Sequence, residues 1–136
     1  MSVARMIAVA VLPAVLAGCE TAPVKGIRQE LVNLLQPSGK AEEALAAGIR
    51  AYEDARYAES SRLLQAGLDE GLSASSDQVR AHKYLAFIHC VSGRQAQCRN
   101  EFRMALAIDP SFELAPSEAG HPMWGPVFRG VKAQGR

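Results

Sequence analysis

From Lys40 onward, one pattern of small and large apolar positions occurs twice along the chain. Residues 44–71 can be laid on a later stretch, ending at Pro110, with a single offset of 38 residues. The matched pairs are Gly48 and Ala86, Ser60 and Cys98, Leu64 and Phe102, and Gly67 and Ala105. Small residues fall on small ones and large apolar residues on large apolar ones, as a repeated helical hairpin requires where its two helices touch. The pattern predicts an all-α fold with two hairpins.

These positions resemble the tetratricopeptide repeat, whose unit of about 34 residues has small residues on both helices, a large apolar residue on the second, and a closing proline. The second copy fits with Gly93 in its turn and Pro110 after Asp109, although Cys98 and His89 replace the usual alanine and aromatic residue. The first copy lacks the closing proline and is lengthened by the stretch GLSASSD. The alternative to this resemblance is a helical bundle without repeats.

The segments on either side are expected to close the ends of the array. Each hairpin buries its apolar face only against neighbours, so two repeats need caps. Before the repeats, Ile27, Leu31, Leu34 and Leu35 follow helical spacing and predict a short amphipathic helix over 27–35. After them, Pro126 suits the first turn of a last helix running toward Lys132. The apolar side chains expected to cap the second repeat, or else to bind a partner, are Trp124, Val127 and Phe128.

The first residues read as a secretory signal, with Arg5 followed by an apolar run from Met6 to Ala17. Its end, LAGC, resembles the lipobox of bacterial lipoproteins, which implies that Cys19 carries a lipid; an ordinary cleaved signal with an accidental cysteine is the alternative. Because Glu20 rather than Asp follows, the resemblance implies the periplasmic face of the outer membrane. We therefore expect a signal peptide at 1–18, a lipidated tether and short helix at 19–39, and a repeat domain at 40–136.

The two remaining cysteines, Cys90 and Cys98, are an even number in an oxidising compartment. A disulfide between them is the leading interpretation, and two small buried thiols are the alternative. A metal site built from His82, His89 and these cysteines matches no compact ligand spacing, so we predict neither a metal nor a cofactor.

Charge and motifs point away from nucleic acid and catalysis. Fifteen basic against fourteen acidic residues give a net charge of +1, and loss of Arg5 with the signal brings it to zero. This balance disfavours binding of nucleic acid or of anionic lipid as the main function. The sequence has no serine in a G-x-S-x-G turn and no glycine-rich phosphate loop. We expect a protein that is not an enzyme.

What remains is a surface for protein binding on the first helix of each hairpin. Its expected outward residues include Leu45 and Ile49, and the candidates for partner contacts are Tyr52, Arg80, Lys83, Tyr84 and Phe87. Apolar residues on such a surface indicate either a bound segment or a covering piece of the same chain. Residues 27–35 and the C-terminal tail are both candidates for that cover.

The closing sequence CRNEFRMALAIDPSFELAPSEAGHPMWGPVFRGVK is similar to the ending of the small lipoproteins associated with type VI secretion systems (TssQ-like or TagM-like). The resemblance implies an accessory role at the cell envelope, with a component of the secretion membrane complex as the partner. The alternatives are a pilotin-like lipoprotein that escorts another outer-membrane protein and a non-catalytic partner of a periplasmic enzyme.

Overall fold

The computed structural model describes residues 39–135, which lie in one compact unit. The predicted signal peptide, the lipidation site Cys19 and the predicted helix at 27–35 lie outside the described residues.

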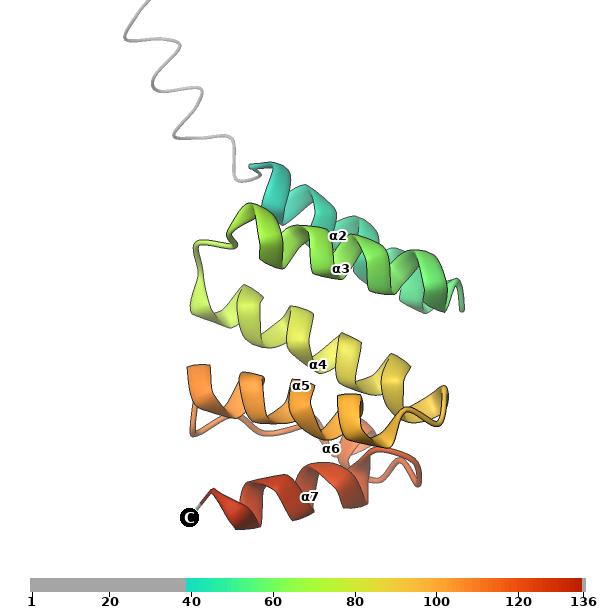
Figure 1. Ribbon diagram of the computed structural model, residues 1–136, viewed down its shortest axis with the longest axis vertical. Coiled ribbons are helices and arrows are strands. Elements are labelled where there is room, and N and C mark those ends of the chain that lie inside the picture. The colour runs from blue at the N-terminus through green and yellow to red at the C-terminus, as the bar shows by residue number, and fades with distance from the viewer. Residues whose placement is uncertain (1–38, 136) are drawn as a thin grey trace, which may run out of the picture. The chain divides into compact units, whose positions relative to one another are not determined.

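Residues 39–135 form α-helices and contain no strand (Figure 1). The helices are α2 (Lys40–Glu53), α3 (Tyr57–Glu70), α4 (Ser75–Val91), α5 (Gln95–Ile108), α6 (Pro116–Ala119) and α7 (Gly125–Gln134). α2 packs along α3 and α4 packs along α5, with short turns that make each pair an antiparallel hairpin. The prediction of an all-α fold with two helical hairpins is confirmed.

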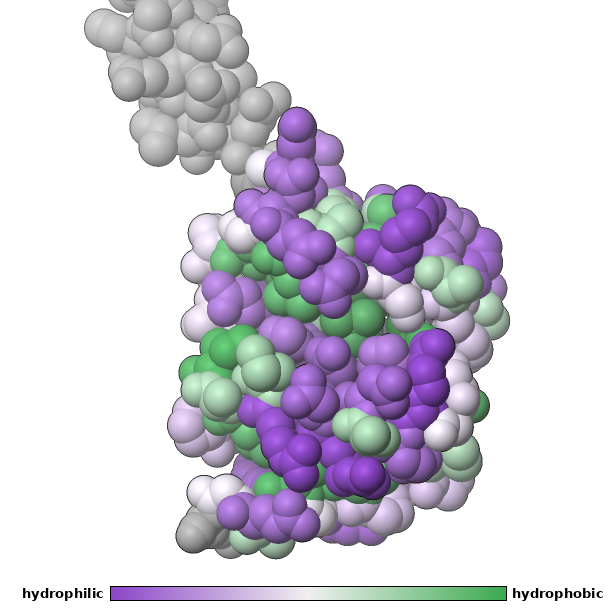
Figure 2. All heavy atoms as spheres, in the orientation of Figure 1, coloured by the Kyte–Doolittle hydropathy of each residue, from purple (hydrophilic) through white to green (hydrophobic). Residues whose placement is uncertain are grey.

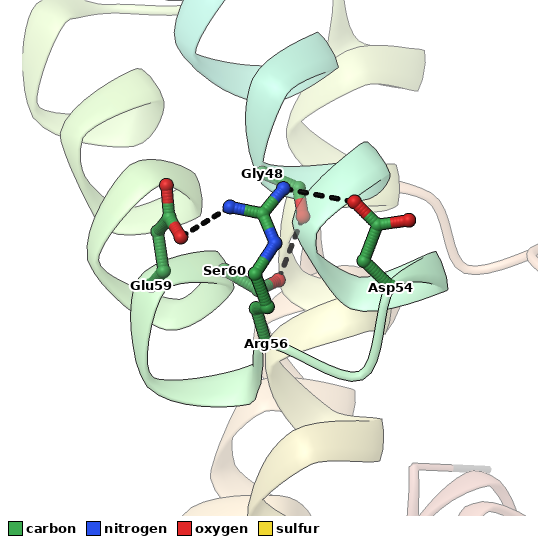
Figure 3. Close-up of polar contacts among 5 residues, drawn as sticks. All are labelled: Gly48, Asp54, Arg56, Glu59 and Ser60. Atoms are coloured by element: carbon green, nitrogen blue, oxygen red, sulfur yellow. Dashed lines mark hydrogen bonds and ion pairs between the residues drawn. The ribbon is translucent and has the colours of Figure 1, made fainter.

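The positions matched in the sequence lie at the contact between the two helices of each hairpin. In the first, a Cβ atom on Gly48 would lie 2.8 Å from Cγ of Leu64, so only glycine permits this approach of α2 and α3. The hydroxyl of Ser60 donates a hydrogen bond of 2.7 Å to the carbonyl oxygen of Gly48 (Figure 3). In the second hairpin, the matching residues Ala86 and Cys98 are fully buried.

The turns of the two hairpins also correspond. Ala55 and Gly93, which the offset pairs, both have a left-handed backbone, with φ of 59° and 74°. Gly93 adopts this conformation without steric cost, whereas a residue with a Cβ is strained there. In the first turn, the Arg56 guanidinium pairs with Asp54 at 2.9 Å and also contacts Glu59 (Figure 3).

α4 lies between the two halves of the core and contributes to both. On one side, Leu85 and Ile88 pack with Leu45, Ile49 and other apolar residues of the first hairpin. On the other side, residues of α4 pack with α5, α7 and the connection before α7. This double burial explains why four consecutive residues of α4, from Leu85 to Ile88, are all buried.

The connection from α5 to α7 returns along the second hairpin, so α7 runs parallel to α5 rather than antiparallel (Figure 1). The ring of Phe128 in α7 lies 5.2 Å from that of Phe102 in α5, nearly edge-on. Lys132, one turn later, donates to the carbonyl oxygen of Phe112 at 2.8 Å. Pro126 lies in the first turn of α7, as predicted. The reversed direction shows that α7 covers the open end without beginning a third hairpin.

Candidate protein-binding surface

Three tyrosines from three helices form a continuous cluster. The ring centroid of Tyr52, at the end of α2, lies 5.0 Å from that of Tyr84 in α4 and 5.5 Å from that of Tyr57 at the start of α3. Tyr57 is 38% exposed, and the other two are half-buried. We call Tyr52, Tyr57 and Tyr84 the tyrosine surface. The sequence predicted Tyr52 and Tyr84 as candidate partner contacts but missed Tyr57, because it belongs to the second helix of its hairpin.

The face of the domain drawn in Figure 2 is mixed in character, with hydrophilic side chains interspersed among smaller apolar areas. Interfaces of proteins that bind and release their partners are similarly mixed, with aromatic anchors inside a polar rim.

The other three predicted contacts lie on the same side of α4 and have different surroundings. Arg80 is exposed and pairs with Asp77 at 3.2 Å. Lys83 is largely covered, and its Nζ lies 2.6 Å from Oε1 of Glu118. Phe87 is only 2% exposed and stacks on Trp124, with ring centroids 4.2 Å apart. The expectation that Phe87 contacts a partner directly is therefore corrected, because the chain's own tryptophan occupies its ring face.

The expectation of outward-facing Leu45 and Ile49 is wrong for the same kind of reason. These side chains are 3% and 8% exposed and belong to the core between α2, α3 and α4. The pattern of α2 alone did not reveal that α4 is packed against this side.

Glu118 in α6 connects the segment before α7 to α4 through hydrogen bonds. One carboxylate oxygen accepts a hydrogen bond from the Lys83 ammonium, and the other accepts one of 3.0 Å from the backbone N–H of Ala115. Its carbonyl oxygen accepts the indole N–H of Trp124 at 2.9 Å. Charged hydrogen bonds of this kind are stronger than neutral ones. One residue thus holds α6, α4 and the start of α7 together.

The predicted capping residues pack against the second hairpin. Trp124 and Phe128 are 7% and 4% exposed, and Val127 is half-buried against the same cluster. The imidazole of His121 stacks on Trp124 with ring centroids 3.3 Å apart. Trp124 and Phe128 are therefore buried inside the domain.

The tyrosine surface presents neutral phenols. Burial, assisted by the neighbouring tyrosines and Glu118, raises the pKa of Tyr52 to about 12. Burial also raises the pKa of Tyr84, with smaller contributions from the negative charges of Glu118 and Glu53. Because a raised pKa favours the protonated form, both hydroxyl groups remain available as donors and acceptors at neutral pH.

The cysteines and the two histidines of α4 have partners of their own. Cys90 and Cys98 form a disulfide that joins α4 to α5, with their Cα atoms 5.2 Å apart. Nδ1 of His82 lies 2.7 Å from the carboxylate of Glu101, and His89 accepts a hydrogen bond of 2.9 Å from Arg94. Within the described part of the chain, no group of three or more His, Cys, Asp or Glu side chains is placed to hold a metal ion.

Comparison with known proteins gives no relative from which to transfer a function. No family model, no curated protein and no solved structure matches this chain. Between residues 39 and 135, no helix has the length and apolar character needed to cross a membrane.

Proposed function

We propose that this chain is a protein-binding module of the bacterial envelope and an accessory component of a type VI secretion system. The observation that carries the binding role is the tyrosine surface, which joins three helices at the edge where the two hairpins meet. Tyrosine is enriched at protein interfaces because it offers a large ring and a polar tip at low cost in conformational entropy.

The packing of the tail supports this surface as the binding site in preference to the C-terminal cluster. Trp124 and Phe128 are buried by the chain itself, whereas Tyr57 keeps more than a third of its surface exposed. A partner therefore reaches Tyr57 and its neighbours without displacing any contact of the second hairpin. Anchoring at the envelope rests on the lipobox-like end of the signal at Cys19, and the secretion system on the resemblance of the closing sequence.

Site-specific photocrosslinking in living cells tests the proposal. A photoreactive phenylalanine in place of Tyr57 should give a discrete crosslinked band in envelope fractions. The same group in place of Gln65, an exposed residue farther along α3, is the matched control and should give none. The band should disappear from a strain that lacks the secretion membrane complex. Equal labelling from both positions would refute the surface, and persistence of the band in that strain would refute the secretion assignment.

A further inference from the structure

A groove opens between the C-terminal ends of α5 and α7, which lie at the same end of the array because the two helices run parallel (Figure 1). Its volume is about 580 Å³, within the range of sites that hold a ligand. Its walls include Arg103, Leu106, Ala107 and Pro110 on one side and Val131 and Lys132 on the other. The groove thus combines apolar walls with two basic side chains.

The repeat shows what fills the same place in the first hairpin. At the offset of 38, the first four of these wall positions correspond to Gln65, Leu68, Asp69 and Leu72. Leu72 is 3% exposed and belongs to the same core cluster as Leu85 of α4. Gln78 of α4 donates a hydrogen bond of 2.7 Å to the carbonyl oxygen of Leu72. In the first hairpin, the chain therefore closes this place with its own leucine.

The second hairpin lacks this closing leucine. Pro110 stands at the position of Leu72 but is exposed, and Leu106, at the position of Leu68, is only partly buried. The connection after Pro110 returns along the hairpin before α7 begins, whereas the connection after Leu72 leads directly into α4 (Figure 1). The place that Leu72 fills in the first copy therefore remains open in the second as the groove.

The charge at these positions also differs between the two copies. Arg103 replaces Gln65 and Ala107 replaces Asp69, so one positive charge is gained and one negative charge is lost. Arg103 is exposed, and it forms no ion pair with any residue between 39 and 135. The groove has therefore become more basic than its counterpart.

The carboxylates closest in sequence to Arg103 are engaged elsewhere. Glu113 pairs with Lys132, and the carboxylate of Asp109 accepts hydrogen bonds from the backbone and side chain of Ser111. Glu101 lies two residues before Arg103, and side chains at this spacing do not face each other on a helix. Its carboxylate contacts His82 of α4 at 2.7 Å. Arg103 is therefore left without a counter-ion from the described part of the chain.

We propose that this groove binds an acidic and apolar segment of a second protein. The segment inserts a leucine-sized side chain where Leu72 lies in the first hairpin, and it places a carboxylate against the guanidinium of Arg103. Arginine matches the planar geometry of a carboxylate, and an apolar anchor inside a polar rim is the usual arrangement of a protein interface. This contact is separate from the tyrosine surface and goes beyond the proposed function.

Binding of a synthetic probe to the purified full chain tests the proposal. The probe is a fluorescently labelled, amidated peptide of repeated Gly-Glu-Leu units. One control peptide has lysine in place of glutamate, and another has alanine in place of leucine. Fluorescence anisotropy measures the affinity. We expect binding of the glutamate-leucine peptide only, and weaker binding as salt screens its charge.

Reversal of one charge locates the carboxylate contact. R103E should weaken binding of the glutamate-leucine peptide about fivefold or more, and it should allow the lysine peptide to bind. R62E is the matched control, because it reverses an exposed charge on α3, and it should change the affinity by less than about twofold.

A second pair of variants tests the apolar part of the groove. A107W places a large ring in the groove and should abolish detectable binding while Arg103 is retained. A46W, at an exposed alanine of α2, is its control and should bind the peptide as the parent does. Both alanines are exposed, so thermal unfolding should show that each variant is folded.

Equal binding of the glutamate and lysine peptides, or equal weakening by R103E and R62E, would overturn the proposal. Failure of the glutamate-leucine peptide to bind, or unchanged binding by A107W, would also overturn it. A dimer of the chain that A107W dissociates would identify a second copy, and not another protein, as the occupant. Capture through position 57 tests the tyrosine surface separately, so failure of the groove leaves the proposed function standing.

Discussion

Replacing Trp124 by alanine should destabilise the domain severely, because this side chain joins the tail to the second hairpin. The indole is 7% exposed and stacks on Phe87. Its N–H donates to the carbonyl oxygen of Glu118. The substitution removes the apolar burial, the ring stacking and the hydrogen bond together.

The expected cost follows from these contacts. Truncation of a buried tryptophan to alanine typically costs about 3 to 5 kcal/mol, which includes the cavity that remains. The lost hydrogen bond accounts for about 1 kcal/mol, and a stacked aromatic pair for about 0.5 to 1.5 kcal/mol beyond its area. A domain of this size has a total stability of roughly 5 to 15 kcal/mol. The variant is therefore expected to lose a large share of its stability.

Thermal unfolding followed by far-ultraviolet circular dichroism measures this loss without depending on the indole signal. About 1 kcal/mol corresponds to about 4 to 8 °C in a domain of this length, so Tm should fall by at least ten degrees or so. M123A, at the neighbouring 42% exposed position, is the control and should change stability by less than about 0.5 kcal/mol. A W124A midpoint within about two degrees of the parent would refute the capping role.

Three further predictions concern the turns, the disulfide and the anchor. A55G should stabilise the protein by about 0.5 to 1 kcal/mol and G93A should destabilise it by about 1 kcal/mol, since both positions have a left-handed backbone. A loss of unfolding free energy in A55G, or a gain in G93A, measured by urea unfolding, would contradict this. Cys90 and Cys98 should yield no free thiol in denatured protein before reduction, and C90A/C98A should lose roughly 2 to 3 kcal/mol. C19S should abolish fatty-acid labelling and release the protein from membrane fractions, and unchanged fractionation would exclude the lipid anchor.

The architecture was predictable because its signal occurs twice in the sequence. Small residues are required where two helices touch, and the matched pair Gly48 and Ala86 therefore marks the hairpin contacts in the amino-acid pattern itself. The direction of α7 was not predictable. Nothing in Pro126 or Val127 indicates whether the last helix runs parallel or antiparallel to α5, because that depends on the path of the long connection.

The candidate surface was predictable only in part, for a related reason. Helical spacing places Lys83, Tyr84 and Phe87 on one side of α4, and the structure agrees. The same spacing cannot distinguish a side that faces solvent from one that a distant segment covers. Phe87 was therefore assigned to a partner although Trp124, far along the chain, covers it. Tyr57 was missed because its proximity to Tyr52 arises from the turn between two helices.

The cover over Phe87 also decides where a partner can bind with useful affinity. A partner that contacts Phe87 must first displace Trp124, so its apparent affinity is reduced by the free energy of that opening. If opening costs the 3 kcal/mol or so expected for loss of the tryptophan contacts, the apparent affinity falls by roughly a hundredfold or more. A partner that contacts Tyr57 incurs no such cost, because that ring is already exposed. For contacts of equal intrinsic strength, the apparent affinity of a partner is therefore lower at Phe87 than at Tyr57. This difference favours binding at Tyr52 and Tyr57.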